Sequence, residues 1–205
     1  MENHMDKVSY IIGRQIGGDF ATQGIGVNVD TFLKGFNSSI KGDESEIDAE
    51  ETQKVMNAFQ VEMAKKATEM ASAAGAQNLE VGTKYLELNK QKDGVLTTGS
   101  GLQYSIEKEG SGISPTAESK VEVNYEGKLI DGTIFDSSYQ RGETTSFPVG
   151  GVIPGWTEAL TLMKEGSIWN LTIPAHLAYG ERGAGGQIGP NAVLNFKVEL
   201  VKVLS

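Results

Sequence analysis

Apolar residues recur at every third or fourth position through roughly the first 90 residues of the chain, which is the spacing of one face of an amphipathic helix. Two short segments show this spacing first, residues 6–24 and residues 28–42, and each ends in glycine. Helices of this length are marginal in isolation and need tertiary contacts for their apolar faces. The pattern therefore predicts two short helices that pack against a partner.

A third helical pattern extends over residues 46–92 without a proline. Ser45 with Asp48 predicts a capping box at its start, and Gly94 predicts its end. At a rise of 1.5 Å per residue the helix would be roughly 70 Å long, more than the diameter of a small domain. We therefore expect it to connect two parts of the molecule.

One stripe of side chains follows this predicted helix at alternating steps of four and three residues, and Asn78 is its only polar member. Such a stripe is typical of a packing seam. Gly75 and Gly82 each cost about 1 kcal/mol relative to alanine inside a helix, which favours a bend there. The stripe consists of Val55, Phe59, Met63, Ala67, Met70, Ala74, Asn78, Val81, Tyr85 and Leu88.

After Gly94 the pattern changes to the alternation of half-buried strands. Asp131 with Gly132 predicts a hairpin turn, and residues 157–163 predict one short amphipathic helix. Several antiparallel strands with a single helix indicate an α+β fold, a curved antiparallel sheet wrapped on that helix. Strand-like segments lie at residues 102–106, 121–125, 129–135, 168–174 and 193–200.

These patterns divide the chain into three parts. Residues 1–44 form a helical dimerisation region, residues 45–93 form the long linking helix, and residues 94–205 form the α+β domain.

A net charge of −9 and a pI of about 4.8 leave no basic surface for a nucleic-acid or anionic-membrane partner. No segment is long and apolar enough to span a bilayer. The absence of cysteine excludes disulfide and thiol chemistry. The polar, acidic start predicts a cytoplasmic location, and a removed signal peptide would leave a periplasmic or outer-membrane-associated one open.

The usual signatures of catalysis and of bound cofactors are missing from the sequence. No G-x-S-x-G nucleophile motif occurs, and the glycine-rich residues 183–190 lack the Lys and Ser/Thr of a phosphate-binding loop. The only histidines are His4 and His176, so we expect no metal site. The sequence predicts a protein that works without a metal or a cofactor.

Aromatic and aliphatic residues gather instead at the ends of the predicted strands, with Asp136 and Arg141 as the only charged candidates among them. An apolar cleft with a few polar groups is the usual make-up of a ligand site. The residues that would form it are Tyr125, Phe135, Phe147, Val152, Ile153, Trp156, Tyr179, Ile188 and Phe196.

The stretches VEVNYEGKLIDGTIFDSS, VIPGWTEAL and LAYGERGAGGQIGP, with the final VLNFKVEL, closely resemble the FKBP-type peptidyl-prolyl cis-trans isomerases. The helical half resembles the N-terminal dimerisation region of the bacterial, macrophage-infectivity-potentiator-like members. The resemblance implies an FKBP-like domain after an all-α dimerisation region, and a homodimer through the N-terminal helices. It also implies unfolded or partly folded proline-containing proteins as substrates, and macrolides of the tacrolimus and rapamycin type as inhibitors.

The resemblance also implies roles for individual residues. Asp136, Tyr179 and Tyr125 would be catalytic, with Asp136 near the twisted bond and held by Tyr125 and Arg141. The Tyr179 hydroxyl and the backbone N–H of Ile153 would donate hydrogen bonds to the carbonyls of the ligand. Substrate-binding residues would be Phe135, Arg141, Phe147, Val152, Ile153, Trp156, Ile188 and Phe196, with Trp156 as the floor.

Rotation about an X-Pro bond breaks amide resonance, with a barrier of about 18–20 kcal/mol. An apolar pocket destabilises the twisted amide less than the planar amide, because the twisted amide is less dipolar. Well-placed hydrogen-bond donors increase this difference in free energy. Two other functions stay open: a chaperone that binds unfolded chains mainly through the helical dimer, with secondary isomerase activity, and an adaptor whose pocket binds one partner loop.

Overall fold

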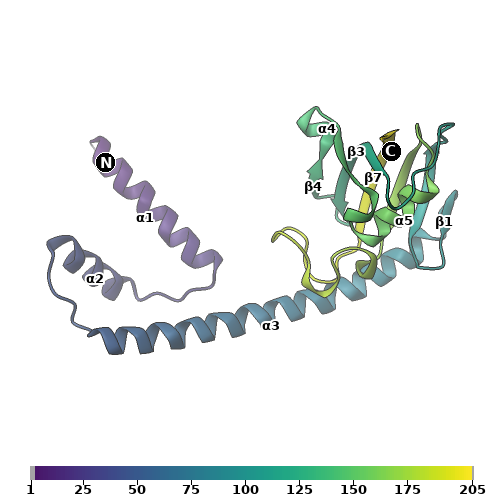
Figure 1. The fold of residues 1–205 in the computed structure, drawn as a ribbon. Helices are drawn as coiled ribbons and strands as arrows, with labels where there is room; N and C mark the ends of the chain where they lie inside the picture. The colour runs from purple at the N-terminus through teal and green to yellow at the C-terminus, as the bar shows by residue number, and fades with distance from the viewer. Residues whose placement is uncertain (1–2, 205) are drawn as a thin grey trace. The chain divides into compact units, whose positions relative to one another are not determined.

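The computed structural model describes residues 3–204, and the chain divides into two compact units, Met1–Glu62 and Met63–Ser205. The first unit contains α1 (His4–Thr22), α2 (Val29–Lys41) and the start of α3 (Ala49–Asn89) (Figure 1). The side chain of Asn3 caps α1 by accepting from the Asp6 N–H at 2.8 Å. The predicted pair of short helices is confirmed.

The apolar faces of α1 and α2 remain uncovered within one chain. Neither helix contains a buried residue. The ring of Phe20 meets that of Phe32 edge-on, with 5.9 Å between their centroids, but Phe36 is 50% exposed and Ile40 is 70% exposed. The contacts within the unit therefore leave most of its apolar surface in water.

α3 is a single helix of 41 residues, and it is shorter at both ends than the sequence pattern predicts. Asp48 caps it, because its Oδ1 accepts from the Glu51 N–H at 2.8 Å. The predicted capping box is wrong, since the Ser45 hydroxyl bonds the backbone of Ile47 in the turn before the helix. Gly75 lies inside α3 without ending it.

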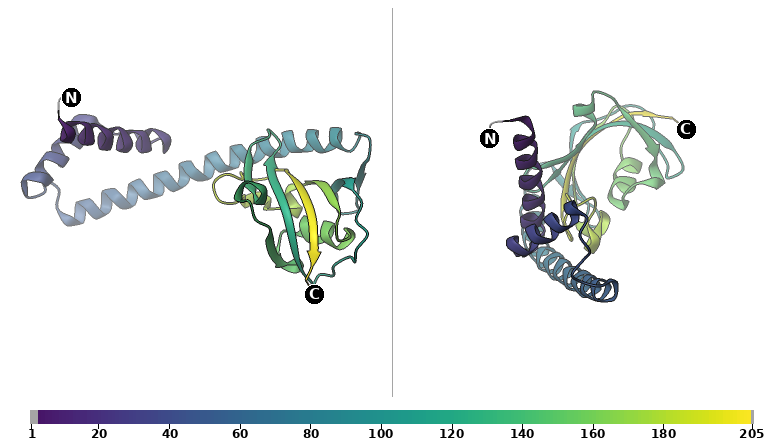
Figure 2. Two further views of the ribbon diagram at one scale, coloured as in Figure 1. Left: turned by 90° about the horizontal axis from the view of Figure 1, so that it is seen from above. Right: turned by 90° about the vertical axis from the view of Figure 1, so that its left-hand side faces the viewer.

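The second unit is built on a seven-stranded antiparallel sheet with strand order β1-β2-β6-β7-β3-β4, in which β5 also pairs with β3. The sheet curves around α5 (Pro154–Leu162), as Figures 1 and 2 show. The predicted α+β architecture is confirmed. The strands are β1 (Val95–Thr97), β2 (Gln103–Lys108), β3 (Lys120–Leu129), β4 (Ile134–Ser137), β5 (Thr145–Pro148), β6 (Ile168–Ile173) and β7 (Leu194–Val203), with the one-turn α4 (Ser138–Arg141) after β4.

The core of this unit lies between the concave face of the sheet and α5. Proline at the first position of α5 starts the helix three residues before the predicted segment, since its fixed φ suits that position. Gly132 has φ 91° in the β3–β4 turn, which confirms the predicted hairpin. The alternate residues of β7 are buried as predicted: Leu194, Phe196, Val198 and Leu200.

The last part of α3 belongs to this unit and contacts the opposite face of the sheet. Asn89 Nδ2 donates to Gln103 Oε1 at 2.9 Å, and Asn195 Nδ2 donates to the Tyr85 hydroxyl at 3.0 Å. The buried residues of α3 are Gly75, Gly82 and Asn89, so the predicted apolar stripe is about one residue out of phase here. The sheet face is polar at Gln103, and it therefore pairs with amides rather than with aliphatic side chains.

None of the helices among residues 3–204 combines the length and the apolar character needed to cross a bilayer.

Candidate active site

A cavity of about 510 Å³ opens between α5 and the strands that curve around it. It gathers ten of the eleven site residues predicted from the sequence, and the eleventh, Arg141, donates hydrogen bonds to two of them, Asp136 and Tyr125. Thr145 and Gly151 line it as well, although the sequence did not assign them to the site. The lining is Tyr125, Phe135, Asp136, Thr145, Phe147, Gly151, Val152, Ile153, Trp156, Tyr179, Ile188 and Phe196.

Trp156 forms the floor of the cavity. It is only 5% exposed, and three aromatic rings surround it: Tyr125 at 5.2 Å, Phe147 at 5.4 Å and Phe196 at 5.2 Å between centroids. Gly155 makes this placement possible, because a Cβ there would lie 2.5 Å from Ile173 Cγ2. The turn at the start of α5 therefore presses the helix against β6 and directs the indole into the cavity.

One wall depends on a glycine that the sequence did not single out. Phe135 from β4 and Phe196 from β7 meet edge-on, with 5.6 Å between ring centroids. A Cβ at Gly127 would lie 2.6 Å from Phe135 Cε2 and 2.7 Å from Phe196 Cε1. The absent side chain in β3 leaves room for both rings, a requirement that no periodicity reveals.

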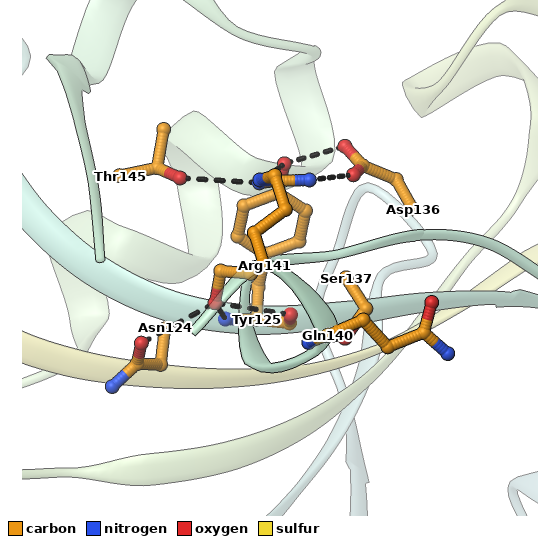
Figure 3. Close-up of polar contacts among 8 residues, drawn as sticks. Asn124, Tyr125, Asp136, Ser137, Gln140, Arg141 and Thr145 are labelled. Atoms are coloured by element: carbon orange, nitrogen blue, oxygen red, sulfur yellow. Dashed lines mark hydrogen bonds and ion pairs between the residues drawn. The ribbon is translucent and has the colours of Figure 1, made fainter. Parts of the chain in front are cut away.

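The polar side of the cavity is a connected set of hydrogen bonds, shown in Figure 3. The Tyr125 hydroxyl donates to Asp136 Oδ2 at 2.5 Å, and Arg141 Nη1 donates to Asp136 Oδ1. Arg141 Nη2 also donates to the Tyr125 hydroxyl at 3.1 Å and to Thr145 Oγ1 at 3.3 Å. Asp136 is therefore held from two sides, with its carboxylate at the cavity.

The short helix α4 brings Arg141 back toward Asp136. Ser137 Oγ starts it by accepting from the Gln140 N–H at 3.3 Å, and Gly142 ends it in the left-handed conformation, with φ 75°. The Tyr125 N–H donates to Ser138 Oγ at 2.8 Å and ties α4 to β3. The arginine thus comes from a capped turn that is fixed to the strand beside it.

This geometry shifts the ionisation of two groups. Burial disfavours the charged form of Asp136, but the hydrogen bonds from Tyr125 and Arg141 and the guanidinium charge outweigh it and lower the pKa of the carboxyl from its ordinary value. Burial, together with the hydrogen bond to the carboxylate, raises the pKa of the Tyr125 hydroxyl. At neutral pH the cavity therefore holds an ionised aspartate and a neutral tyrosine.

Two further donors line the cavity. The Tyr179 hydroxyl and the backbone N–H of Ile153 have no hydrogen-bond partner within residues 3–204, and the Tyr179 side chain is 40% exposed. Both can donate to carbonyl groups of a bound peptide.

Metal ligands do not gather anywhere in the described part of the chain, where no group of three or more His, Cys, Asp or Glu side chains could hold an ion. His176 lies away from the cavity, with Nε2 at 2.9 Å from the Ser100 carbonyl oxygen. The arrangement can bind an apolar ring, hydrogen-bond its flanking carbonyls and present one fixed negative charge.

A second cavity, of about 410 Å³, lies on the other face of the sheet beside the end of α3. Asn170, Asn195 and Lys197 are among its lining residues. Its polar floor suits an apolar ring much less well than the aromatic cavity does.

Comparison with known proteins gives consistent results over nearly the whole chain. A family model described as FKBP-type peptidyl-prolyl cis-trans isomerase matches residues 112–201, and one described as the domain amino terminal to FKBP-type peptidyl-prolyl isomerase matches residues 5–106. The crystal structure of FkpA from Escherichia coli is similar with a TM-score of 0.76 and 36% sequence identity, covering 99% of this chain and 98% of that one.

Two relatives show the same similarity in sequence. The chain is 44% identical over 198 residues to the outer membrane protein MIP of Legionella longbeachae, covering 97% of this chain and 85% of the relative. It is 43% identical over 199 residues to the FKBP-type 22 kDa peptidyl-prolyl cis-trans isomerase of Escherichia coli, covering 97% and 95%. The chain belongs to the FKBP-type isomerase family, as a macrophage-infectivity-potentiator-like member, and is a peptidyl-prolyl cis-trans isomerase.

Proposed function

We propose that the aromatic cavity binds the X-Pro segment of unfolded or partly folded proteins, with the proline ring on the indole of Trp156. The observation that carries this assignment is an aromatic floor with two donors in one cavity, the Tyr179 hydroxyl and the Ile153 N–H, neither of which has a partner within residues 3–204. These donors hold the peptide carbonyls, and Asp136 lies beside the bond that rotates.

The cavity lowers the barrier to rotation by treating the two states of the amide differently. The planar amide is the more dipolar one, so it loses more solvation free energy than the twisted amide does when it moves from water into aromatic surroundings. The carboxylate of Asp136, fixed by Tyr125 and Arg141, acts on the charge distribution of the twisted bond without needing to reorganise. No covalent bond to the enzyme forms.

The test is the isomerisation of a short prolyl peptide by variants of the full chain. We expect Tyr179→Phe to lower kcat/KM roughly fivefold, the effect of one lost hydrogen bond, and Asp136→Ala to lower it about tenfold or more, because a charged partner is lost. Tyr139→Phe is the matched control, since its hydroxyl lies at 3.5 Å from Glu199 Oε2 and outside the cavity. Wild-type rates in both site variants would contradict the assignment.

We also propose that the N-terminal helices join two copies of the chain, since α1 and α2 bury no residue in one copy. Light scattering of the full chain should give twice the mass of 21.9 kDa. Phe36→Glu puts a charge on the uncovered face of α2 and should give a monomer, whereas Ser39→Glu on the same helix should leave the dimer intact. A full-length monomer at micromolar concentration would contradict this proposal.

A second candidate function is chaperone-like binding of unfolded chains, mainly through the helical dimer, with isomerase activity secondary. Suppression of aggregation by residues 1–92 alone would support it, and the adaptor alternative predicts no turnover of a short peptide.

Tacrolimus or rapamycin should inhibit the wild-type enzyme by competing for the aromatic cavity. The cytoplasmic location stays a prediction, which fractionation of cells expressing the gene would test.

A further inference from the structure

The segment 183–193, between the turn Gly180–Arg182 and β7, carries Ile188 into the cavity. The Ala184 N–H donates to the Ile188 carbonyl at 2.8 Å, and the Ile188 N–H donates to the Ala184 carbonyl at 3.0 Å. These bonds close a narrow hairpin, at whose base Ile188 is only 8% exposed. The position of this wall of the cavity therefore depends on how the base of the hairpin is held.

Two side-chain amides join that base to α3, one from the helix and one from the segment. Asn78 Nδ2 donates to the Pro190 carbonyl at 2.8 Å, and Asn191 Nδ2 donates to the Gly75 carbonyl at 3.3 Å. The helix and the segment lie so close that a Cβ at Gly75 would be 3.1 Å from Pro190 Cβ. Two reciprocal hydrogen bonds, one in each direction, thus join helix and segment at a glycine.

The same contact reaches the proposed catalytic tyrosine. The Asn191 N–H donates to the Gly180 carbonyl at 2.8 Å, one residue after Tyr179. Asn191 has φ 55°, a left-handed conformation that asparagine tolerates better than most residues do. The backbone at Asn191 therefore links α3 on one side to the residues around Tyr179 on the other.

Asn78 is not part of the cavity lining, and it is the polar member of an otherwise apolar stripe. An aliphatic side chain at this position could pack but could not hold the Pro190 carbonyl. We propose that Asn78 is a positioning residue of the isomerase: through Pro190 it sets where Ile188 and Tyr179 lie, and so how tightly the peptide binds. This inference rests on the proposed role of the aromatic cavity.

The experiment compares Asn78→Leu with Gln77→Leu in the full chain, on a short prolyl peptide. Both changes replace an amide by a branched alkyl group, but Gln77 is exposed and its amide makes no hydrogen bond to the segment within residues 3–204. We expect Asn78→Leu to raise KM roughly threefold to tenfold and to change kcat by less than about twofold. Gln77→Leu should leave both constants unchanged.

Two measurements separate positioning from simple loss of stability. Near-UV circular dichroism shows whether each variant is folded at the assay temperature, and amide NMR shifts of Ile188 and Tyr179 should move in Asn78→Leu but not in Gln77→Leu. A purely structural asparagine would lower the unfolding midpoint and leave KM of the folded enzyme unchanged.

Asn191→Gly supplies an independent variant. Glycine keeps the left-handed backbone and removes only the bond to the Gly75 carbonyl, so KM should rise here too. If Asn78→Leu does not fold, Asn78→Ala, which removes the same bond to Pro190 without adding bulk, is measured in its place.

Wild-type KM in the folded variants would overturn the positioning role. If Asp136→Ala and Tyr179→Phe also keep wild-type rates, then the cavity itself is wrongly assigned. If these two variants lose activity while the Asn78 variant keeps the wild-type KM, only the positioning role of Asn78 is wrong.

Discussion

The helix α3 runs through both units, the helical unit (residues 3–62) and the isomerase unit (residues 63–204). Its side chains differ in solvent exposure between the two. In the first part of α3, Val55 is 52% exposed and Met56 is 46% exposed. In the last part, Gly75, Gly82 and Asn89 are buried. The apolar residues are thus uncovered within one chain, and the small and polar residues are packed.

Apolar periodicity therefore indicates where a helix needs a partner, but not how closely the partner approaches. Glycine contributes no apolar signal, yet it permits the shortest distance between a helix and a neighbouring loop. Amides contribute a polar signal, yet Asn89 pairs with Gln103 at 2.9 Å and is buried. The most tightly packed part of α3 is therefore the part whose sequence looks least like a packing face.

The largest effect should appear when the helical unit is removed. We expect residues 63–205 to turn over a short prolyl peptide like the full chain, because the whole cavity lies within them. On the proline-limited refolding of a protein, their rate should fall roughly tenfold to a hundredfold, because they lack the effective concentration that two linked binding surfaces would provide in the proposed dimer. Refolding kinetics with and without residues 1–62 measure the ratio. Equal losses on both substrates would reduce the helical unit to a dimerisation element.

Gly82→Leu tests the packed part of α3. A Cβ at this position would lie 2.7 Å from Val193 Cγ2, so the variant should lower the free energy of unfolding by about 1–3 kcal/mol. Thr83→Leu is the control at the exposed neighbouring position and should cost little. Urea unfolding followed by near-UV circular dichroism compares the two. Similar midpoints for both variants would mean that helix and loop are not closely packed there.

Gly35→Ala tests the uncovered part of the chain, and here we expect a gain in stability instead of a loss. Nothing lies within 4 Å of a Cβ at Gly35 in α2, so alanine should raise helix stability by up to about 1 kcal/mol. Thermal unfolding followed at 222 nm measures the shift. A loss of stability would instead indicate that a second chain packs against this glycine, as the proposed dimer allows.

The smallest effect concerns pH. The lowered pKa of Asp136 means that its ionised form stabilises the folded chain above the ordinary aspartate pKa, and that this contribution is lost as pH falls through the lower folded value. Peptide turnover should therefore stay level from neutral pH to below the ordinary aspartate range. Arg141→Leu removes a hydrogen bond and a positive charge and should move the acid limb to higher pH. The full chain and residues 63–205 should give the same profile, and an unmoved limb would contradict the role of Arg141.

Much of the fold could be predicted from the sequence because its main features obey a simple period. The alternation along β7 is strict since one face of that strand is buried, and the β3–β4 turn needs the positive φ that Gly132 supplies. Aromatic and aliphatic residues at strand ends predicted an apolar cleft, but the roles of individual residues came from the resemblance, because such a pattern does not indicate which rings meet.

Other features could not be predicted because they depend on contacts between distant segments. The outward-facing Thr172 of β6 looks solvent-exposed by alternation, but it is 7% exposed because the end of α3 covers it. Gly127 matters only because Phe135 and Phe196 meet above it. The bond between Asn78 and Pro190 joins residues 112 positions apart, a distance at which no local pattern operates.

The placement of the indoles also gives the molecule a built-in optical reporter. The chain has two tryptophans, and both lie in the isomerase unit: Trp156 on the cavity floor, and Trp169 stacked on Tyr104 with 4.4 Å between ring centroids. Trp156 lines the cavity and Trp169 does not, so a ligand that covers the Trp156 indole should change the emission of that residue. Intrinsic fluorescence can therefore follow ligand entry without a label, and association of the tryptophan-free helices contributes no tryptophan signal of its own.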